Sequence, residues 1–469
     1  MGVSKFAAAL VVFSALICIA QTKFPNTPAG HQCAAWLDSF NRGDTNAHRD
    51  FLQKNSPERL THLEREMEFR QRTGGFDVKK VQESTATKIV VMVQERLSDQ
   101  FALLTMEVQA EQPHTITRIE LSTIPRPAEF SLPHLSENQL VAAVKKHIEK
   151  GVAADSFAGA VMIAKDGKPV LAEAYGLADR EHKIPNMLKT RFRIGSMNKM
   201  FTAVAALQLA EARKLDVKDT VGQYLTDYPN KDIASKVTIR QLLSHTGGTG
   251  DIFGPDFDAH RTQLRTIADY IKLYGDRAPK FEPGTHWEYS NYGFILLGAI
   301  IEKVSGQSYY DYVREHIYDP AGMTSTGSEP EDKPVPDRSI GYTKNSTAWT
   351  PNTDTLPYRG SSAGGGYSTV EDLTRFAKAL EGHKLLDVLY TDMLTTGKPG
   401  TPDNTYAYGF EDRLMNGTRC FGHGGGAPGM NGDLRICPSP GYVVVVLANL
   451  DPPAASRISG FIVNRLPEK

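Results

Sequence analysis

The sequence predicts an α/β (α+β) protein, in which a small α+β unit precedes a larger domain whose sheet is assembled from both ends of that domain. Three observations support this prediction. The chain has 469 residues, more than one domain of about 100 to 200 residues accommodates. A helical pattern and then strand-like runs fill the region before residue 126. Strand-like runs also open and close the region 134–469, with mostly helical patterns between them.

Composition limits the classes of function. The chain has 53 Lys plus Arg against 54 Asp plus Glu, a formal net charge of −1, and its charge runs are short and mixed in sign. A nucleic-acid partner is therefore not expected, because phosphate contacts call for a basic excess or stripe. With 40% hydrophobic and 23% charged residues, the chain has the composition of a folded globular protein.

The first twenty residues have the pattern of a secretory signal peptide. Lys5 precedes the apolar run 6–20, and Cys18 and Ala20 are small residues suited to cleavage before Gln21. The run of about 15 residues fits a signal core better than a retained anchor, which needs about 20. We expect a secreted or periplasmic protein with signal peptide 1–20 and no membrane span after cleavage.

The small unit is expected over residues 31–126. Apolar residues at helical spacing follow Cys33, and the stretch 41–44 ends that helix. Strands are predicted at 87–93, 101–108 and 115–124. Helices followed by an antiparallel sheet resemble the cystatin-like or steroid-isomerase-like folds, and this resemblance implies no catalytic residue.

The large domain is expected over residues 134–469. A β-hairpin is predicted at its start because Asp166-Gly167 separates two strand-like runs. The remaining elements follow from apolar periodicity. In chain order the predicted elements are a helix at 136–150, strands at 157–164 and 169–175, a helix at 193–215, strands at 434–437 and 442–448, and a helix at 456–466.

The first chemical motif is Ser196-x-x-Lys199, at the start of the long helix. Residues three apart on a helix share a face, so the amine can accept the hydroxyl proton during nucleophilic attack. Backbone N–H groups at a helix start also face any negative charge that develops there. Alone the motif is weak, since an N-cap serine and a solvated lysine would produce the same pattern.

The second motif is Tyr289-Ser290-Asn291, just before an apolar helix. A phenol beside a cationic amine can have its pKa lowered from about 10, which makes Tyr289 a candidate base or acid. The Asn291 amide could hold a substrate carbonyl or orient the lysine. The third motif is His423-Gly424-Gly425-Gly426, before the final strands. Glycines let a backbone approach a ligand, and their N–H groups can form half of an oxyanion hole.

These three motifs, in this order, resemble the serine β-lactamase and penicillin-binding-protein superfamily over residues 136–466. The branch most similar contains class C β-lactamases, D-alanyl-D-alanine carboxypeptidases and family VIII esterases. The resemblance implies a β-lactamase/transpeptidase-like antiparallel sheet flanked by helices, with an all-helical insertion. It also implies a serine hydrolase that acts through an acyl-enzyme and uses no cofactor or metal, and the signal peptide implies that this hydrolase is exported.

The resemblance assigns roles residue by residue. Ser196 would be the acylated nucleophile and Lys199 its proton partner, while Tyr289 would relay protons to the leaving group. Asn291, His423, Gly424 and Gly425 would bind substrate. The oxyanion hole would be the backbone N–H groups of Ser196 and Gly426.

His423 and Gly424 depart from the family pattern, which has Lys followed by Thr or Ser. That lysine and hydroxyl normally hold a substrate carboxylate, whereas His is mostly neutral above a pKa of about 6.5 and Gly424 has no hydroxyl. Esters, amides or peptides, including a cell-wall peptide, are therefore favoured as substrates over β-lactams. Esterase, peptidase and β-lactamase activities stay open, as does a non-catalytic protein that binds a partner or the cell wall.

Ser362 is a rival nucleophile, because residues 360–364 match the G-x-S-x-G pattern of α/β-hydrolases. That motif needs a strand directly before it and a helix directly after it, and the surrounding sequence predicts neither. We interpret 360–366 as a bend near the site. His245 and His286 are expected to hold loops through hydrogen bonds.

Export implies an oxidising compartment, so the remaining cysteines are possible disulfide partners. Cys420 and Cys437 flank a glycine-rich turn and the strand after it, so antiparallel pairing could bring them face to face. A disulfide between them would leave Cys33 single. Three cysteines this far apart have no zinc-ligand spacing.

Overall fold

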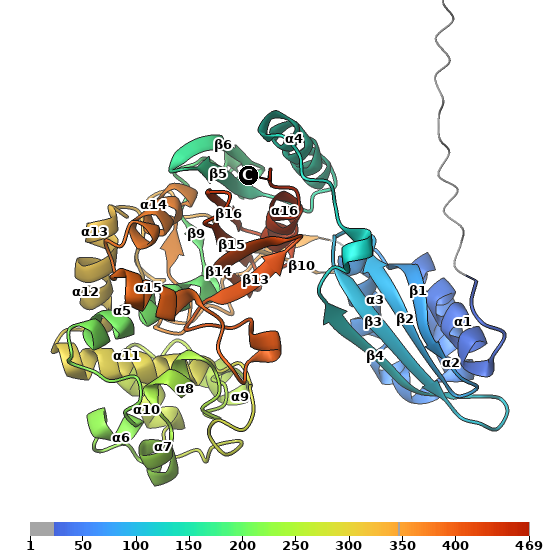
Figure 1. The fold of residues 1–469 in the computed structure, drawn as a ribbon, viewed down its shortest axis with the longest axis horizontal. Coiled ribbons are helices and arrows are strands. Elements are labelled where there is room, and N and C mark those ends of the chain that lie inside the picture. The colour runs from blue at the N-terminus through green and yellow to red at the C-terminus, as the bar shows by residue number, and fades with distance from the viewer. Residues whose placement is uncertain (1–22, 346–347, 469) are drawn as a thin grey trace, which may run out of the picture. The chain divides into compact units, whose positions relative to one another are not determined.

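The computed structural model describes residues 23–345 and 348–468, and the chain divides after Pro125 into two compact units (Figure 1). The proposed signal peptide lies outside the described residues. None of the helices within the described ranges is long and apolar enough to cross a bilayer.

The small unit packs three helices on a four-stranded antiparallel sheet of order β1-β2-β3-β4. Thr27 caps its first helix, and Gly43, in the left-handed region at φ 72°, ends it. Its elements are α1 (Pro28–Arg42), α2 (Thr45–Asn55), η1 (Pro57–His62), α3 (Leu63–Thr73), β1 (Phe76–Ser84), β2 (Lys88–Glu95), β3 (Phe101–Val108) and β4 (Ile116–Ile124).

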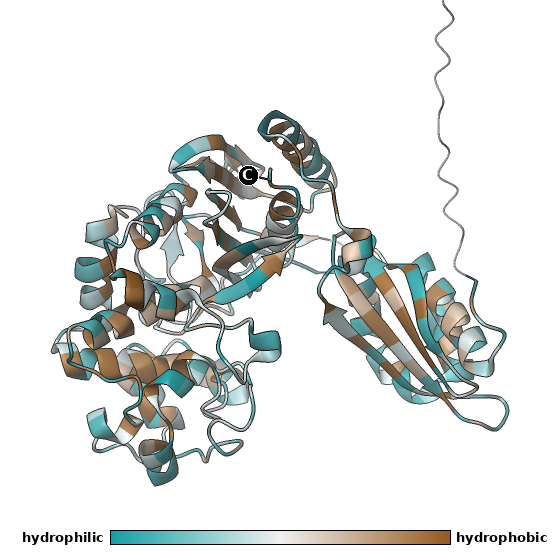
Figure 2. Cartoon of the chain, viewed as in Figure 1, coloured by the Kyte–Doolittle hydropathy of each residue, from teal (hydrophilic) through white to brown (hydrophobic). Residues whose placement is uncertain are grey.

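The sequence patterns missed α2, α3 and the edge strand β1. Only Phe76 of β1 is buried, and charged residues occupy much of the strand, so it carries little of the alternation by which a strand is recognised. Figure 2 shows apolar residues concentrated on the sheet strands, where Val91 and Leu104 are fully buried. Between the helices, His48 bonds Ser39 and Glu66, and Glu66 also pairs with Arg59.

The large unit is built on a six-stranded antiparallel sheet of order β13-β14-β15-β16-β5-β6. Of these six strands, the last in the sequence (residues 442–448) pairs with the first in the sequence (residues 159–165), as Val446 opposite Val161 shows. This confirms the prediction that both ends of the domain share one sheet. The strands are β5 (Gly159–Lys165), β6 (Lys168–Tyr175), β13 (Glu411–Met415), β14 (Thr418–Ala427), β15 (Met430–Cys437) and β16 (Tyr442–Ala448).

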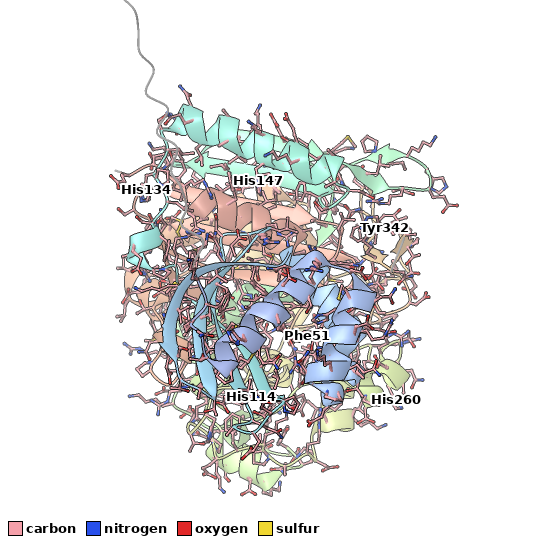
Figure 3. All side chains as sticks on the ribbon, turned by 90° about the vertical axis from the view of Figure 1, so that its right-hand side faces the viewer. Phe51, His114, His134, His147, His260 and Tyr342 are labelled. Carbon is pink, nitrogen blue, oxygen red and sulfur yellow. A yellow bond between two sulfur atoms is a disulfide. The ribbon has the colours of Figure 1, made fainter. Side chains whose placement is uncertain are left out.

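Helices cover both faces of this sheet, which confirms the predicted fold class (Figure 1). On one face α4 (Glu137–Ala153) packs on α16 (Ala454–Val463), where the ring of His147, labelled in Figure 3, stacks on Phe461 at 4.1 Å between centroids. On the other face lie α5 (Asn198–Glu211) and α14 (Val370–Glu381).

A helical insertion separates α5 from α14 (Figure 1). Its longest helix, α11 (Asn291–Ser305), begins at the Ser290 cap and ends at Gly306. The other helices of this region are α6 (Val221–Tyr224), α7 (Lys231–Lys236), α8 (Ile239–Leu243), α9 (Pro255–His260), α10 (Ile267–Tyr274), α12 (Tyr309–Val313), η4 (Arg314–Tyr318) and α13 (Asp319–Ala321).

The remaining elements are short connections. They are η2 (Ala128–Phe130), β7 (Leu177–Asp179), β8 (Ile184–Pro185), β9 (Phe192–Arg193), η3 (Gly195–Met197), β10 (Tyr342–Lys344), β11 (Trp349–Pro351), β12 (Tyr367–Ser368), α15 (Val388–Thr395) and η5 (Pro402–Asn404). Cys420 and Cys437 form a disulfide between β14 and β15, and Cys33 is a free, buried thiol in the small unit.

Candidate active site

Ser196 lies in the short turn η3, before helix α5. The predicted start of this helix at residue 193 is wrong, because Gly195 takes a left-handed φ of 51° that an α-helix does not accommodate. A Cβ at Gly195 would lie 3.1 Å from the backbone nitrogen of Gly426. The glycine therefore brings the Ser196 turn directly against strand β14.

Lys199 is fully buried one turn after Ser196. Its Nζ lies 3.2 Å from the Ser196 Oγ and 2.7 Å from the Asn291 Oδ1, and it also donates to the Ala363 carbonyl. Burial lowers the pKa of Lys199 to about 7, although the charge of Asp251 raises it. A substantial fraction of this amine is neutral near pH 7, so it can accept the serine proton.

Tyr289 precedes α11 and covers the amine of Lys199, whose Nζ lies 4.7 Å from the phenol ring centroid. Its hydroxyl is buried and faces Ser196, but it makes no well-formed hydrogen bond within the described residues. Burial raises the pKa of Tyr289 well above its ordinary value, despite the lowering effect of Ser196. The expected lowering of this pKa is therefore wrong, and the phenol keeps its proton at neutral pH.

His423 lies on β14 and is buried behind the site rather than open to it. Its Nε2 is 3.0 Å from the Tyr406 hydroxyl, which in turn is 2.9 Å from the Nε2 of His245. The Ser290 N–H donates to His245 Nδ1, and the other His423 nitrogen faces the Gly424 carbonyl. A carbonyl can only accept, so the proton of His423 sits on Nδ1 and its Nε2 accepts from Tyr406.

His423 and His245 are both neutral. Burial lowers the pKa of His423 to about 4, although Glu411 raises it, and burial takes the pKa of His245 well below its ordinary value. The site therefore has no cation at the position where the family pattern has Lys. Tyr406 was not predicted from the sequence, and His245 holds its neighbouring loop as expected.

The glycines after His423 leave space beside Ser196. A cavity of about 360 Å³ opens there. Strand β15 pairs with β14 throughout this stretch, but β13 pairs with its other side only as far as Gly422. From His423 onward, that side of β14 has no strand partner in the described sheet. The cavity is lined by Ser196, Tyr289, Glu411, Arg413, Gly424, Gly425, Gly426, Asn431, Gly432, Asp433, Arg435 and Ser456.

Asn291 and His423 do not line this cavity, whereas Gly424, Gly425 and Gly426 do. The rival Ser362 is fully buried, and a Cβ at Gly298 of α11 would lie 2.3 Å from its Oγ. A nucleophile packed against a helix has no access to substrate. Within residues 23–345 and 348–468, no group of three or more His, Cys, Asp or Glu is arranged to hold a metal ion.

Comparisons with known proteins identify the family of this chain. A penicillin-binding protein named PbpX, of Bacillus subtilis (strain 168), is 31% identical over 329 residues, which cover 69% of this chain and 76% of that protein. Penicillin-binding protein 4* of the same strain is 30% identical over 58% of this chain and 64% of its own length.

Solved structures of related proteins have a similar fold. A penicillin-binding protein from Bacillus halodurans has a TM-score of 0.62 at 33% identity, over 68% of this chain and 98% of that one. A D-stereospecific amidohydrolase from Streptomyces sp. has a TM-score of 0.59 at 28% identity, over 69% of this chain and 98% of that one. The family model described as Beta-lactamase matches residues 144–466. The chain therefore belongs to the serine β-lactamase and penicillin-binding-protein superfamily.

Proposed function

We propose that this protein is a serine hydrolase that cleaves ester or amide bonds through an acyl-enzyme on Ser196. The observation that carries the proposal is the fully buried Lys199 amine, 3.2 Å from the Ser196 Oγ. A buried lysine whose pKa lies near 7 is suited to proton transfer rather than to a structural ion pair. The large unit supplies every residue of this mechanism.

Acylation begins when the neutral Lys199 amine takes the proton of the Ser196 hydroxyl as the oxygen attacks the substrate carbonyl. A bond forms between the serine oxygen and the carbonyl carbon, and the carbonyl electron pair moves onto its oxygen. We assign the backbone N–H groups of Ser196 and Gly426 to hold this oxyanion, since the Gly195 turn packs on Gly426.

Collapse of the tetrahedral intermediate needs a proton for the leaving group. Tyr289 is a protonated phenol whose hydroxyl faces Ser196, so it can donate to the departing oxygen or nitrogen. The ammonium of Lys199 then returns a proton to the tyrosine. Water attacks the acyl-enzyme in the second half of the reaction, and its proton returns through the same two groups as Ser196 is released.

The neutral His423 favours esters, amides and peptides over β-lactams as substrates. The Nε2 of His423 is held by Tyr406, so it offers neither a positive charge nor a free N–H to a substrate carboxylate. The similarity to a D-stereospecific amidohydrolase supports cleavage of an amide bond, as by a D-alanyl-D-alanine carboxypeptidase-like peptidase, and an esterase is the alternative. A class C-like β-lactamase is the second candidate, supported by the family match.

We also propose that the protein is exported, to the periplasm or the medium. The leader-like residues 1–20 support this proposal, and so does the disulfide between Cys420 and Cys437, since disulfides persist in oxidising compartments.

A substrate panel tests the proposed function. Purified protein is assayed with p-nitrophenyl esters, D-Ala-D-Ala peptides and nitrocefin, beside the variants Ser196→Ala and Ser362→Ala. We expect turnover of an ester or peptide that Ser196→Ala abolishes and Ser362→Ala retains. Turnover that survives in Ser196→Ala would contradict the mechanism, and fast hydrolysis of nitrocefin alone would favour the β-lactamase.

A further inference from the structure

Asp251 lies beside Asn291, in the loop between α8 and α9. One carboxylate oxygen, Oδ1, accepts from the Asn291 Nδ2 at 2.8 Å and from the Ile252 N–H at 2.7 Å. Side chains of residues 274 and 277, which lie outside this loop, also hold its backbone. Arg277 donates to the Asp251 carbonyl at 2.9 Å, and the Tyr274 hydroxyl donates to the Ile252 carbonyl at 2.9 Å. The carboxylate is thus fixed in place.

This carboxylate decides how the Asn291 amide is turned. An ionised carboxylate only accepts hydrogen bonds, so the amide nitrogen of Asn291 must face Asp251. The amide oxygen then faces Lys199, whose Nζ lies 2.7 Å away. One N–H of Asn291 is thereby bound to Asp251. Without this partner, the amide could turn over, and the Lys199 amine would then lose the oxygen to which it donates.

We propose that Asp251 is a positioning residue for the acylation step, acting through Asn291 on Lys199 by an uninterrupted chain of hydrogen bonds and by its negative charge. The proposal rests on the proposed function, because it concerns the amine that activates Ser196. Asp251 belongs to none of the three sequence motifs. Its role follows only from the structure, in which its loop contacts the start of α11.

The charge of Asp251 acts on Lys199 in a definite direction. Burial lowers the pKa of Lys199 to about 7, and Asp251 opposes this by stabilising the ammonium form. The other titratable groups that face Lys199 are Tyr289, His245 and His423, which are uncharged at neutral pH. Removing the carboxylate charge therefore lowers the pKa of Lys199 further, and the amine stays neutral at lower pH.

The test compares Asp251→Asn with wild type and with Asp251→Ala. Asparagine keeps an oxygen that can accept from Asn291 but loses the charge, whereas alanine loses both. Asp256→Asn is the matched control, because Asp256 is an exposed acid in the adjoining helix α9. The readout is the rate of labelling by a fluorophosphonate probe, measured from pH 5 to 9, with the modified residue located by mass spectrometry.

For Asp251→Asn, we expect the acid limb of the pH profile to move down by about one unit. This variant then keeps a larger share of its plateau rate at pH 6 than wild type does. Asp251→Ala should show the same shift of the acid limb. It should also lose about tenfold in plateau rate, because Asn291 no longer has an acceptor that fixes its orientation. Asp256→Asn should match wild type.

Failure of this inference and failure of the proposed function give different results. Wild type that is not labelled at Ser196 would overturn the proposed function. Wild type labelled at Ser196, with an Asp251→Asn profile that superposes on it, would overturn the role of Asp251 alone. An Asp251→Asn chain that does not fold would also overturn it, because the proposal assigns this carboxylate to the site rather than to the fold.

Discussion

Replacement of Tyr289 by phenylalanine separates activity from stability. The Tyr289 hydroxyl is buried without a well-formed hydrogen bond to any described residue, and a buried unsatisfied hydroxyl costs about 1 to 3 kcal/mol. Phenylalanine removes that hydroxyl and keeps the ring that lies over the Lys199 amine. We expect Tyr289→Phe to raise the free energy of unfolding by about 1 kcal/mol. Activity should fall by about 10²- to 10⁴-fold, since the leaving group loses its proton donor.

Tyr292→Phe is the matched control. The Tyr292 hydroxyl is buried and bonded to the Tyr228 hydroxyl at 2.9 Å, so the same chemical change there breaks a hydrogen bond. We expect it to lower the free energy of unfolding by about 1 to 2 kcal/mol and to leave labelling of Ser196 intact. Urea denaturation followed by tryptophan fluorescence measures both variants, and ester hydrolysis measures activity. Tyr289→Phe that is destabilised, or that keeps wild-type activity, would refute the reasoning.

Three further predictions concern other parts of the molecule. Lys199→Met should lower the labelling rate of Ser196 by about 10²- to 10⁴-fold and abolish the acid limb near pH 7, and a pH profile of labelling checks both effects. Cys420→Ala/Cys437→Ala should lower the free energy of unfolding by about 3 kcal/mol, measured in urea, because the disulfide closes a loop with a sequence separation of 17. Burial alone would raise the pKa of Glu66, but bonds to His48 and Arg59 hold it below its ordinary 4.5. Glu66→Gln should therefore lower the thermal stability of the small unit at pH 7, and the difference from wild type should vanish as the pH falls below the folded-state pKa.

How much of the site the sequence predicts differs between the three motifs. Ser196 and Lys199 are one helical turn apart, so local geometry alone brings their side chains within contact distance. Tyr289 reaches the same point from a distant segment, and only the resemblance to a known family indicated it. The six-stranded sheet is also predicted in outline, since β5 and β16 carry long apolar runs.

Other features depend on contacts that no local pattern records. Tyr406 joins His245 across 161 residues, and Asp251 joins Asn291 across 40. The raised pKa of Tyr289 depends on burial, which its neighbours in sequence do not reveal. The start of α5 was misplaced because the residues before Asn198 suit a helix, while packing against β14 selects the left-handed turn at Gly195.

Identification of the residue that a substrate acylates tests the central claim most directly. The protein is mixed with a slowly released ester or a fluorophosphonate and quenched in acid, and its peptides are mapped by mass spectrometry. The mechanism predicts one adduct, on Ser196, that forms in wild type and is absent in Ser196→Ala. An adduct on Ser362 or another residue, or an unmodified Ser196 in protein that is turning over substrate, would contradict it.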